Sequence, residues 1–101
     1  DMNRTGEVVL DDCTLYYLSD EDGQTQIELT YNKETPENGY ENGNAFGHLA
    51  FETNSMEEFS KRMQSMGYEY LYEPYFMPEV NMHIAFLKDP DGNEIEIMSK
   101  Q

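Results

Sequence analysis

The chain has 101 residues, of which 38% are hydrophobic and 13% aromatic, and its formal net charge is −15. This length supports one modest core, and this composition is too apolar for a disordered acidic chain. The charge excludes nucleic acid and anionic membranes as favoured partners, because both present phosphates of the same sign. An anionic small substrate would need a metal ion or local basic residues to offset this field.

The cysteine content and the hydropathy pattern indicate a cytoplasmic protein. Cys13 is the single cysteine, so no intrachain disulfide is expected. No apolar run approaches the roughly 20 residues of a membrane helix, and no signal-type segment opens the chain. Since the sequence begins with Asp1 rather than Met, we expect it to be processed or to be part of a longer chain.

Residues 1–32 predict two strands joined as a hairpin. The segment EVVLDDCTLYYL (7–18) is rich in β-branched and aromatic residues, and its second half is typical of a strand. The turn SDEDGQ (19–24) leads into TQIELTYN (25–32), where apolar and polar residues alternate strictly. Glu28 therefore lies on the face opposite its aliphatic neighbours.

A polar stretch with a proline and two glycines, residues 32–44, predicts a loop. The next segment, AFGHLAFET (45–53), predicts a strand in which His48 shares a face with Phe46 and Ala50. A lone histidine within a strand is most often a structural residue. His48 is therefore only a candidate at this point.

A helix is predicted to follow this strand. Ser55 and Glu58 have the spacing of a capping box, and Gly67 is placed to end the helix. Four apolar residues recur at spacings of three and four: Met56, Phe59, Met63 and Met66. We expect this stripe to pack into the core rather than to bind a partner.

Three further strands are predicted after the helix: YEYLY (68–72), MHIAFLK (82–88) and NEIEIMS (93–99). The proline-containing segment EPYFMPEVN (73–81) predicts a loop between the first two. His83 faces away from its apolar neighbours Met82 and Ile84, and we expect it to be structural.

The order of predicted elements indicates an α+β fold built from paired βαβββ modules. Residues 45–101 hold one complete β-α-β-β-β series. The strands within residues 1–32 match the end of a second series whose first strand and helix are missing, and residues 33–44 join the two. We therefore expect one domain with an incomplete first module.

The acidic segment KDPDGNEIEIMSK (88–100) is a tight turn followed by a strand. An EF-hand loop that started at Asp89 would need glycine at its sixth position and glutamate at its twelfth, but Glu94 and Lys100 stand there. Pro90 and Gly92 suit a turn instead. Alternation then places Glu94 and Glu96 on one face.

Three strands each carry one central ligand-type side chain opposite aliphatic neighbours, namely Glu28, His48 and Glu96. Spacing alone favours a solvated sheet face for the two glutamates. The three together suit a divalent metal site, and imidazole with carboxylates favours Ni, Co, Zn, Mn or Fe(II) over calcium. Both interpretations stay open at this point.

QIELTYN, FGHLAF and IAFLKDPDGNEIEI together resemble glyoxalase I (lactoylglutathione lyase), a family of the vicinal oxygen chelate superfamily, over residues 13–99. The resemblance implies one divalent metal ion per site, Ni²⁺ or Zn²⁺, bound by Glu28, His48 and Glu96. It also implies that Glu96 is the catalytic base, that Asn32 contacts the substrate, and that the protein is a homodimer with sites at the interface. A further metal ligand would come from the missing first strand.

The activity implied by the resemblance is isomerisation of the hemithioacetal of methylglyoxal and a thiol to an S-D-lactoyl thioester. Glu96 would remove a proton from one carbon and return it to the next. Basic residues that could bind the glutathione carboxylates are absent from residues 73–83, so the thiol stays open. The alternatives are another chemistry of the superfamily, thiol transfer or extradiol dioxygenation, and a non-catalytic small-molecule binding module.

Overall fold

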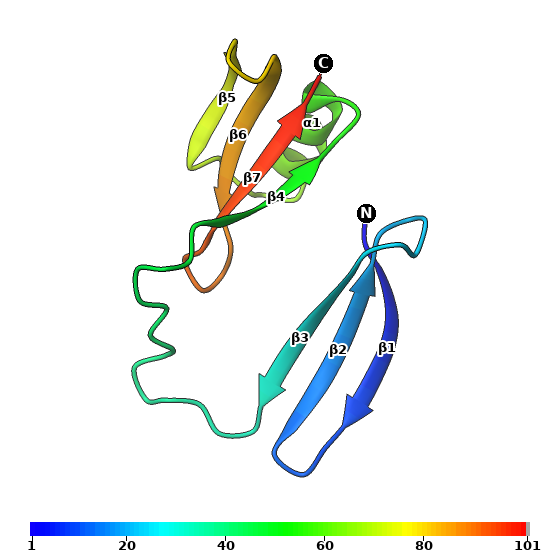
Figure 1. Cartoon of the computed structure of the whole chain (residues 1–101), viewed down its shortest axis with the longest axis vertical. Helices are drawn as coiled ribbons and strands as arrows, with labels where there is room; N and C mark the ends of the chain where they lie inside the picture. Colours follow the sequence, from blue (N-terminus) through cyan, green and yellow to red (C-terminus); the bar gives the residue numbers. More distant parts are fainter. Residues whose placement is uncertain (101) are drawn as a thin grey trace. The chain divides into compact units, whose positions relative to one another are not determined.

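The computed structural model describes residues 1–100, and it divides the chain into two compact units, Asp1–Glu41 and Asn42–Gln101. Each unit has its own sheet (Figure 1). Among the described residues, no helix is long and apolar enough to span a membrane. The units are described separately below.

The first unit is a three-stranded antiparallel sheet in the order β1-β2-β3. Its strands are β1 (Asn3–Val9), β2 (Cys13–Ser19) and β3 (Gln26–Asn32). The hairpin of β2 and β3 is confirmed, but the prediction of two strands was wrong because β1 adds a third. The residues of β1 do not alternate regularly between apolar and polar, because the register with β2 shifts between Arg4 and Gly6.

The second unit is a four-stranded sheet with one helix. Its elements are β4 (His48–Glu52), α1 (Met56–Ser65), β5 (Tyr72–Met77), β6 (Met82–Lys88) and β7 (Glu94–Ser99). The sheet order is β4-β7-β6-β5, and β7 pairs parallel with β4 and antiparallel with β6. This confirms the predicted β-α-β-β-β order and the α+β class.

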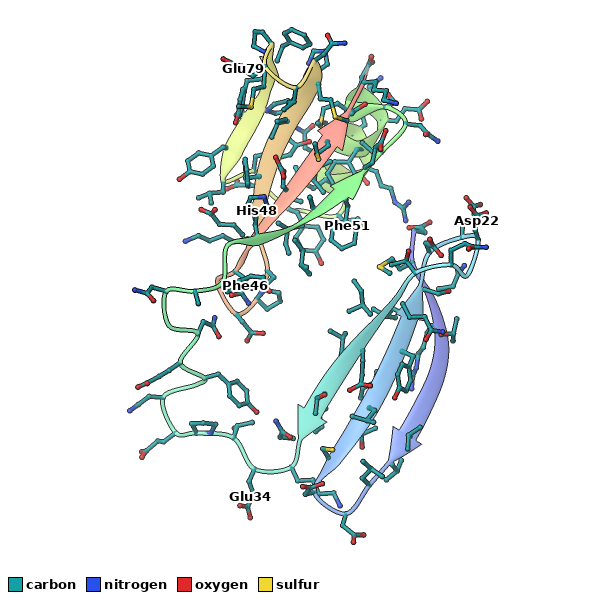
Figure 2. All side chains as sticks on the ribbon, viewed as in Figure 1. Asp22, Glu34, Phe46, His48, Phe51 and Glu79 are labelled. Carbon is teal, nitrogen blue, oxygen red and sulfur yellow. The ribbon has the colours of Figure 1, made fainter. Side chains whose placement is uncertain are left out.

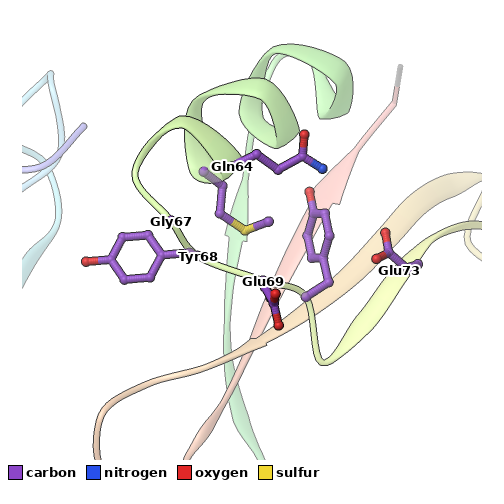
Figure 3. Close-up of a pocket in the computed structure, with 7 residues that line it drawn as sticks. Gln64, Gly67, Tyr68, Glu69 and Glu73 are labelled. Carbon is purple, nitrogen blue, oxygen red and sulfur yellow. The ribbon is translucent and has the colours of Figure 1, made fainter.

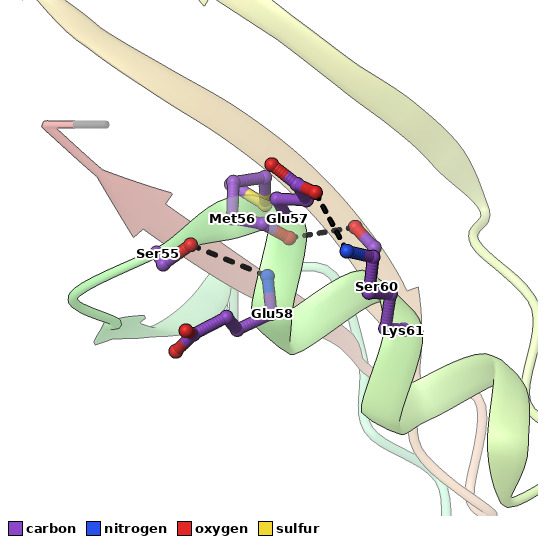
Figure 4. A network of polar contacts seen from close by, with 6 residues as sticks. All are labelled: Ser55, Met56, Glu57, Glu58, Ser60 and Lys61. Carbon is purple, nitrogen blue, oxygen red and sulfur yellow. Dashed lines mark hydrogen bonds and ion pairs between the residues drawn. The ribbon is translucent and has the colours of Figure 1, made fainter.

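Helix α1 begins and ends where the sequence predicts. The Ser55 hydroxyl accepts a hydrogen bond from the Glu58 backbone N–H at 3.2 Å, and Lys61 pairs with Glu57 at 2.7 Å (Figure 4). Gly67 has a φ of 83°, the left-handed conformation that favours glycine after a helix. Met66 is 57% exposed, so its predicted place in the core was wrong. It is the last residue of the apolar stripe and already caps the helix.

The predicted strand at residues 68–72 and the loop at 73–81 were both wrong, because β5 runs from Tyr72 to Met77. Tyr70 instead packs against the core, and its hydroxyl lies 2.7 Å from the Ser60 hydroxyl. Pro74 is tolerated because β5 is an edge strand and the register with β6 is irregular between Tyr72 and Tyr75.

The core of the second unit lies between α1 and one face of its sheet. Met56, Ala85 and Ile97 are buried together, and Phe51, Phe59, Tyr70, Leu87 and Ile95 pack against them. Strand residues alternate between faces. The residues between these core positions, including His48, Phe86 and Glu96, therefore lie on the face opposite α1, which we call the open face.

Candidate functional site

The turn between β6 and β7 sets the position of Glu96. Asp89 Oδ1 accepts hydrogen bonds from the backbone N–H groups of Asp91 and Asn93 at 3.0 and 2.7 Å, and Gly92 has a φ of 85°. This confirms the turn predicted from DPDG. Because the turn fixes the hairpin register, Phe86 lies directly opposite Glu96.

Four residues form a row across the open face, one from each strand. Tyr72 pairs with Phe86, Phe86 with Glu96, and Glu96 with Ala50. The Tyr72 and Phe86 rings meet edge to face, with centroids 5.8 Å apart. Glu96 thus has an aromatic neighbour on one side and a methyl group on the other.

His48 reaches this carboxylate from the first residue of β4. Its Nε2 lies 2.9 Å from Glu96 Oε2. The His48 and Phe86 rings are nearly perpendicular, with an interplanar angle of 88° and a distance of 5.5 Å between their centroids. The His48 side chain is 40% exposed and that of Glu96 is 13% exposed. Figure 2 shows His48 on β4. The imidazole is therefore the more accessible member of the pair.

Glu28 lies in the first unit, on β3, directly opposite Tyr17 of β2. The Glu28 carboxylate, followed by burial of the phenol, raises the pKa of Tyr17. The Thr30 hydroxyl donates a hydrogen bond to Glu28 Oε1 at 3.5 Å. Glu28 itself is exposed.

The other residues singled out in the sequence have local partners. Asn32 lies on the same face of β3 as Glu28, and its Nδ2 donates to the Tyr40 hydroxyl at 2.8 Å. His83 lies on the face opposite Phe86, and its ring contacts Phe76 at 5.2 Å. Glu94 is opposite His48 in the parallel ladder.

The chemistry of the His48–Glu96 pair fits a divalent metal ion. An imidazole nitrogen and a carboxylate oxygen are borderline donors that suit Ni²⁺ or Zn²⁺. His48 Nε2 and Glu96 Oε2 are 2.9 Å apart, so both atoms could bind the same ion. Over residues 1–100, no group of three or more His, Cys, Asp or Glu side chains gathers as a metal site. The second unit by itself supplies two donors.

A separate cavity of about 430 Å³ lies at the end of α1. Gln64, Tyr68, Tyr70 and Glu73 are among its lining residues (Figure 3). It includes neither His48 nor Glu96. We therefore place the candidate site on the open face and not in this cavity.

The aromatic neighbours of the site were not predicted from the sequence. Tyr17, Phe86 and Tyr72 stand in apolar strands, where aromatic residues are ordinary. Only the register identifies them, because it pairs Tyr17 with Glu28 and Phe86 with Glu96. The signal that could have found them is the length of the two hairpin turns, which fixes that register.

The chain matches a known superfamily over most of its length. The family model of the glyoxalase/bleomycin resistance protein/dioxygenase superfamily matches residues 5–97. The chain belongs to this superfamily, as the resemblance predicted.

The chain is similar to curated proteins named lactoylglutathione lyase. The chain is 38% identical over 82 residues to the lactoylglutathione lyase of Neisseria meningitidis serogroup A, and 37% identical over 90 residues to a probable lactoylglutathione lyase of Vibrio cholerae. These matches cover 81% and 87% of this chain, but only 58% and 64% of the two relatives.

Solved structures agree with this comparison. A glyoxalase I mutant from Zea mays superposes with a TM-score of 0.82 at 25% identity, covering 99% of this chain and 36% of that one. The trypanothione-dependent glyoxalase I of Leishmania major gives a TM-score of 0.71 at 28% identity, covering 98% and 69%. The glyoxalase-like vicinal oxygen chelate fold is thus confirmed.

Proposed function

We propose that this protein is a glyoxalase I-type isomerase, which converts the hemithioacetal of methylglyoxal and a thiol to an S-D-lactoyl thioester. The observation that carries the proposal is the 2.9 Å contact between His48 Nε2 and Glu96 Oε2 on the open face. The similarity to lactoylglutathione lyases supports it.

Glu96 is proposed as the base. Its carboxylate would remove the proton from the carbon that bears the sulfur and return it to the neighbouring carbon, so the reaction needs no redox partner. The side chain is 13% exposed, and Phe86 stands beside it. Both features keep most bulk water away from the transferred proton.

His48 and Glu96 are proposed as metal ligands, with Glu28 as a third and Ni²⁺ or Zn²⁺ as the ion. A bound divalent ion would act as a Lewis acid and increase the acidity of the substrate C–H. The Phe86 ring would hold the His48 imidazole in its ligating orientation through their edge contact. Asn32 is proposed to contact the thiol part of the substrate, and the active form is proposed to be a cytoplasmic homodimer.

The deciding experiment measures thioester formation by the protein after metal removal and reloading with Ni²⁺ or Zn²⁺. Methylglyoxal is supplied with glutathione and with other thiols in turn. We expect turnover that requires metal and falls about 10²- to 10⁴-fold in Glu96→Gln. Glu94→Gln is the matched control, since Glu94 is on the same strand and face but lacks the contact with His48 Nε2.

Three results would contradict the proposal. Turnover of Glu96→Gln at the wild-type rate would remove Glu96 as the base. Metal binding without isomerisation for any thiol would favour another chemistry of the superfamily. Absence of Ni²⁺ and Zn²⁺ binding would favour a non-catalytic binding module.

A further inference from the structure

A series of hydrogen bonds joins the segment before β4 to the turn before β7. Asn42 Nδ2 donates to Asn93 Oδ1 at 2.9 Å, although 51 positions separate the two residues. Asn93 in turn donates twice to Asp89, from its backbone N–H to Oδ1 at 2.7 Å and from its Nδ2 to Oδ2 at 3.0 Å. The turn therefore holds the Asn93 side chain in an orientation that presents its Oδ1 to Asn42.

Both ends of this series lead directly into the candidate site. Asn93 immediately precedes β7, the strand that carries Glu96. Asn42 lies in the segment that leads into β4, which begins at His48. Figure 1 shows the chain entering β4 beside the turn between β6 and β7. The two asparagines thus join the starts of the two strands that supply His48 and Glu96.

His48 occupies a weakly held position in its sheet. It is the first residue of β4, and β4 lies at the edge of the sheet, next to β7. The ends of edge strands open at a small cost in free energy. Residues 42–47 are exposed and lie in neither a strand nor a helix, so the ladder with β7 begins only at His48. The hydrogen bond from Asn42 to the turn restrains the chain on the other side of His48.

We propose that Asn42 and Asn93 are positioning residues whose hydrogen bond, which we call the Asn42–Asn93 clamp, holds the His48 imidazole beside Glu96 for metal binding. The inference rests on the proposed function, because it takes His48 and Glu96 as ligands of one ion. Both asparagines act through His48, and neither is proposed as a ligand. Where His48 spends time away from Glu96, the apparent metal affinity falls in proportion to the fraction of molecules in which the pair is assembled.

The first measurement uses the full chain without metal. The His48 and Phe86 ring centroids are 5.5 Å apart, so their ring protons should give nuclear Overhauser effects. We expect Asn42→Ala to weaken these signals. The signals between His83 and Phe76, whose centroids are 5.2 Å apart, are the internal reference and should not change. A merely structural role of Asn42 would not affect one histidine and spare the other.

The second measurement is the affinity for Co²⁺, by calorimetric titration and by the visible spectrum of the bound ion. We expect Asn42→Ala to weaken Co²⁺ binding roughly two- to tenfold, which is the effect of losing one net hydrogen bond. Asn44→Ala is the matched control and should bind Co²⁺ like the wild type. Asn44 is exposed in the same segment, and its side chain has no hydrogen-bond partner among the described residues.

A double variant shows whether Asn42 acts through Asn93. Asn42→Ala should cause no further loss of Co²⁺ affinity in an Asn93→Ala background, because its partner is already absent. Independent roles of the two residues would give additive losses instead. Circular dichroism and thermal unfolding check that each variant is folded.

The outcomes separate this inference from the proposed function. If the wild type binds Co²⁺ and Asn42→Ala binds it equally well, or keeps the same His48–Phe86 signals, the clamp is overturned while the proposed function stands. Additive losses in the double variant overturn the clamp in the same way. If the wild type binds no Co²⁺, Ni²⁺ or Zn²⁺, both are overturned.

Discussion

His48 Nε2 and Glu96 Oε2 are 2.9 Å apart although 48 positions separate these residues in the sequence. The contact exists because β4 and β7 are neighbouring parallel strands, so that both side chains lie on the open face. The register places His48 opposite Glu94, and its ring therefore reaches diagonally to Glu96.

Replacing His48 by alanine should reduce Ni²⁺ and Zn²⁺ affinity by more than the roughly 10- to 100-fold typical of losing an outer partner, because a ligand itself is removed. Calorimetric titration measures this. His83→Ala is the control, since His83 is on the opposite face of β6 against Phe76. Equal metal binding by wild type and His48→Ala would exclude His48 as a ligand.

Replacing Phe86 by leucine should weaken metal binding, because the ring that holds the His48 imidazole at 88° is lost. Phe76→Leu removes the equivalent contact with His83, at 5.2 Å. Each ring contact is worth roughly 0.5–1.5 kcal/mol of stability, and Phe86→Leu loses two because Phe86 also contacts Tyr72. Only Phe86→Leu should also lower metal affinity. Metal titration measures the affinity of each variant, and chemical denaturation measures its stability. A similar loss of affinity in both variants would point to a general effect of destabilisation.

Replacing Asp89 by alanine should lower the free energy of unfolding by about 1–3 kcal/mol, because two backbone N–H groups lose their acceptor. Urea denaturation measures this change. Since the turn sets the register that opposes Phe86 and Glu96, turnover should fall as well. Asp91→Ala, at the neighbouring turn position, is the control. The interpretation fails if the two variants unfold at the same urea concentration.

The Cys13 thiol should react slowly with alkylating reagents near neutral pH. Burial and then the Asp12 carboxylate raise its pKa, which lowers the thiolate fraction. Asp12→Asn should bring the pKa down and speed alkylation, as followed by mass spectrometry. Alkylation of Asp12→Asn at the wild-type rate would exclude this charge effect.

The same shift has a stability consequence with a definite sign. A raised pKa in the folded state means that the folded protein holds the proton more tightly than the unfolded chain does. The contribution of Cys13 to the free energy of unfolding is therefore fully present below the ordinary thiol pKa. It is lost as the pH rises through the pKa of Cys13 in the folded state. Cys13→Ser should reduce the fall in unfolding free energy over that alkaline range.

Much of the second unit could be predicted from the sequence because its signals are local. Ser55, Gly67 and the DPDG turn act within a few residues, and they located α1 and the β6–β7 hairpin correctly. β5 was misplaced because Pro74 reads as a strand breaker, and only the sheet order shows that it stands in an edge strand.

The site could be predicted only in part, because its geometry depends on long-range pairing. Alternation put His48 and Glu96 each on the face away from aliphatic residues, but their 2.9 Å contact requires the parallel register of β4 and β7. The same dependence holds in the first unit, where Tyr17 faces Glu28 only in the observed register of β2 and β3.

The position of β7 in the sheet has a consequence for how the protein folds. It is the last strand of the described chain, yet it lies between β4 and β6. Parallel pairing with β4 closes a loop that contains α1, β5 and β6, and such closures are slow steps in folding. His48 and Glu96 thus meet only when β7 inserts. While β7 is still inside the ribosome, His48 of a nascent chain would have no Glu96 beside it. The His48–Glu96 pair would therefore form only when the second unit has folded.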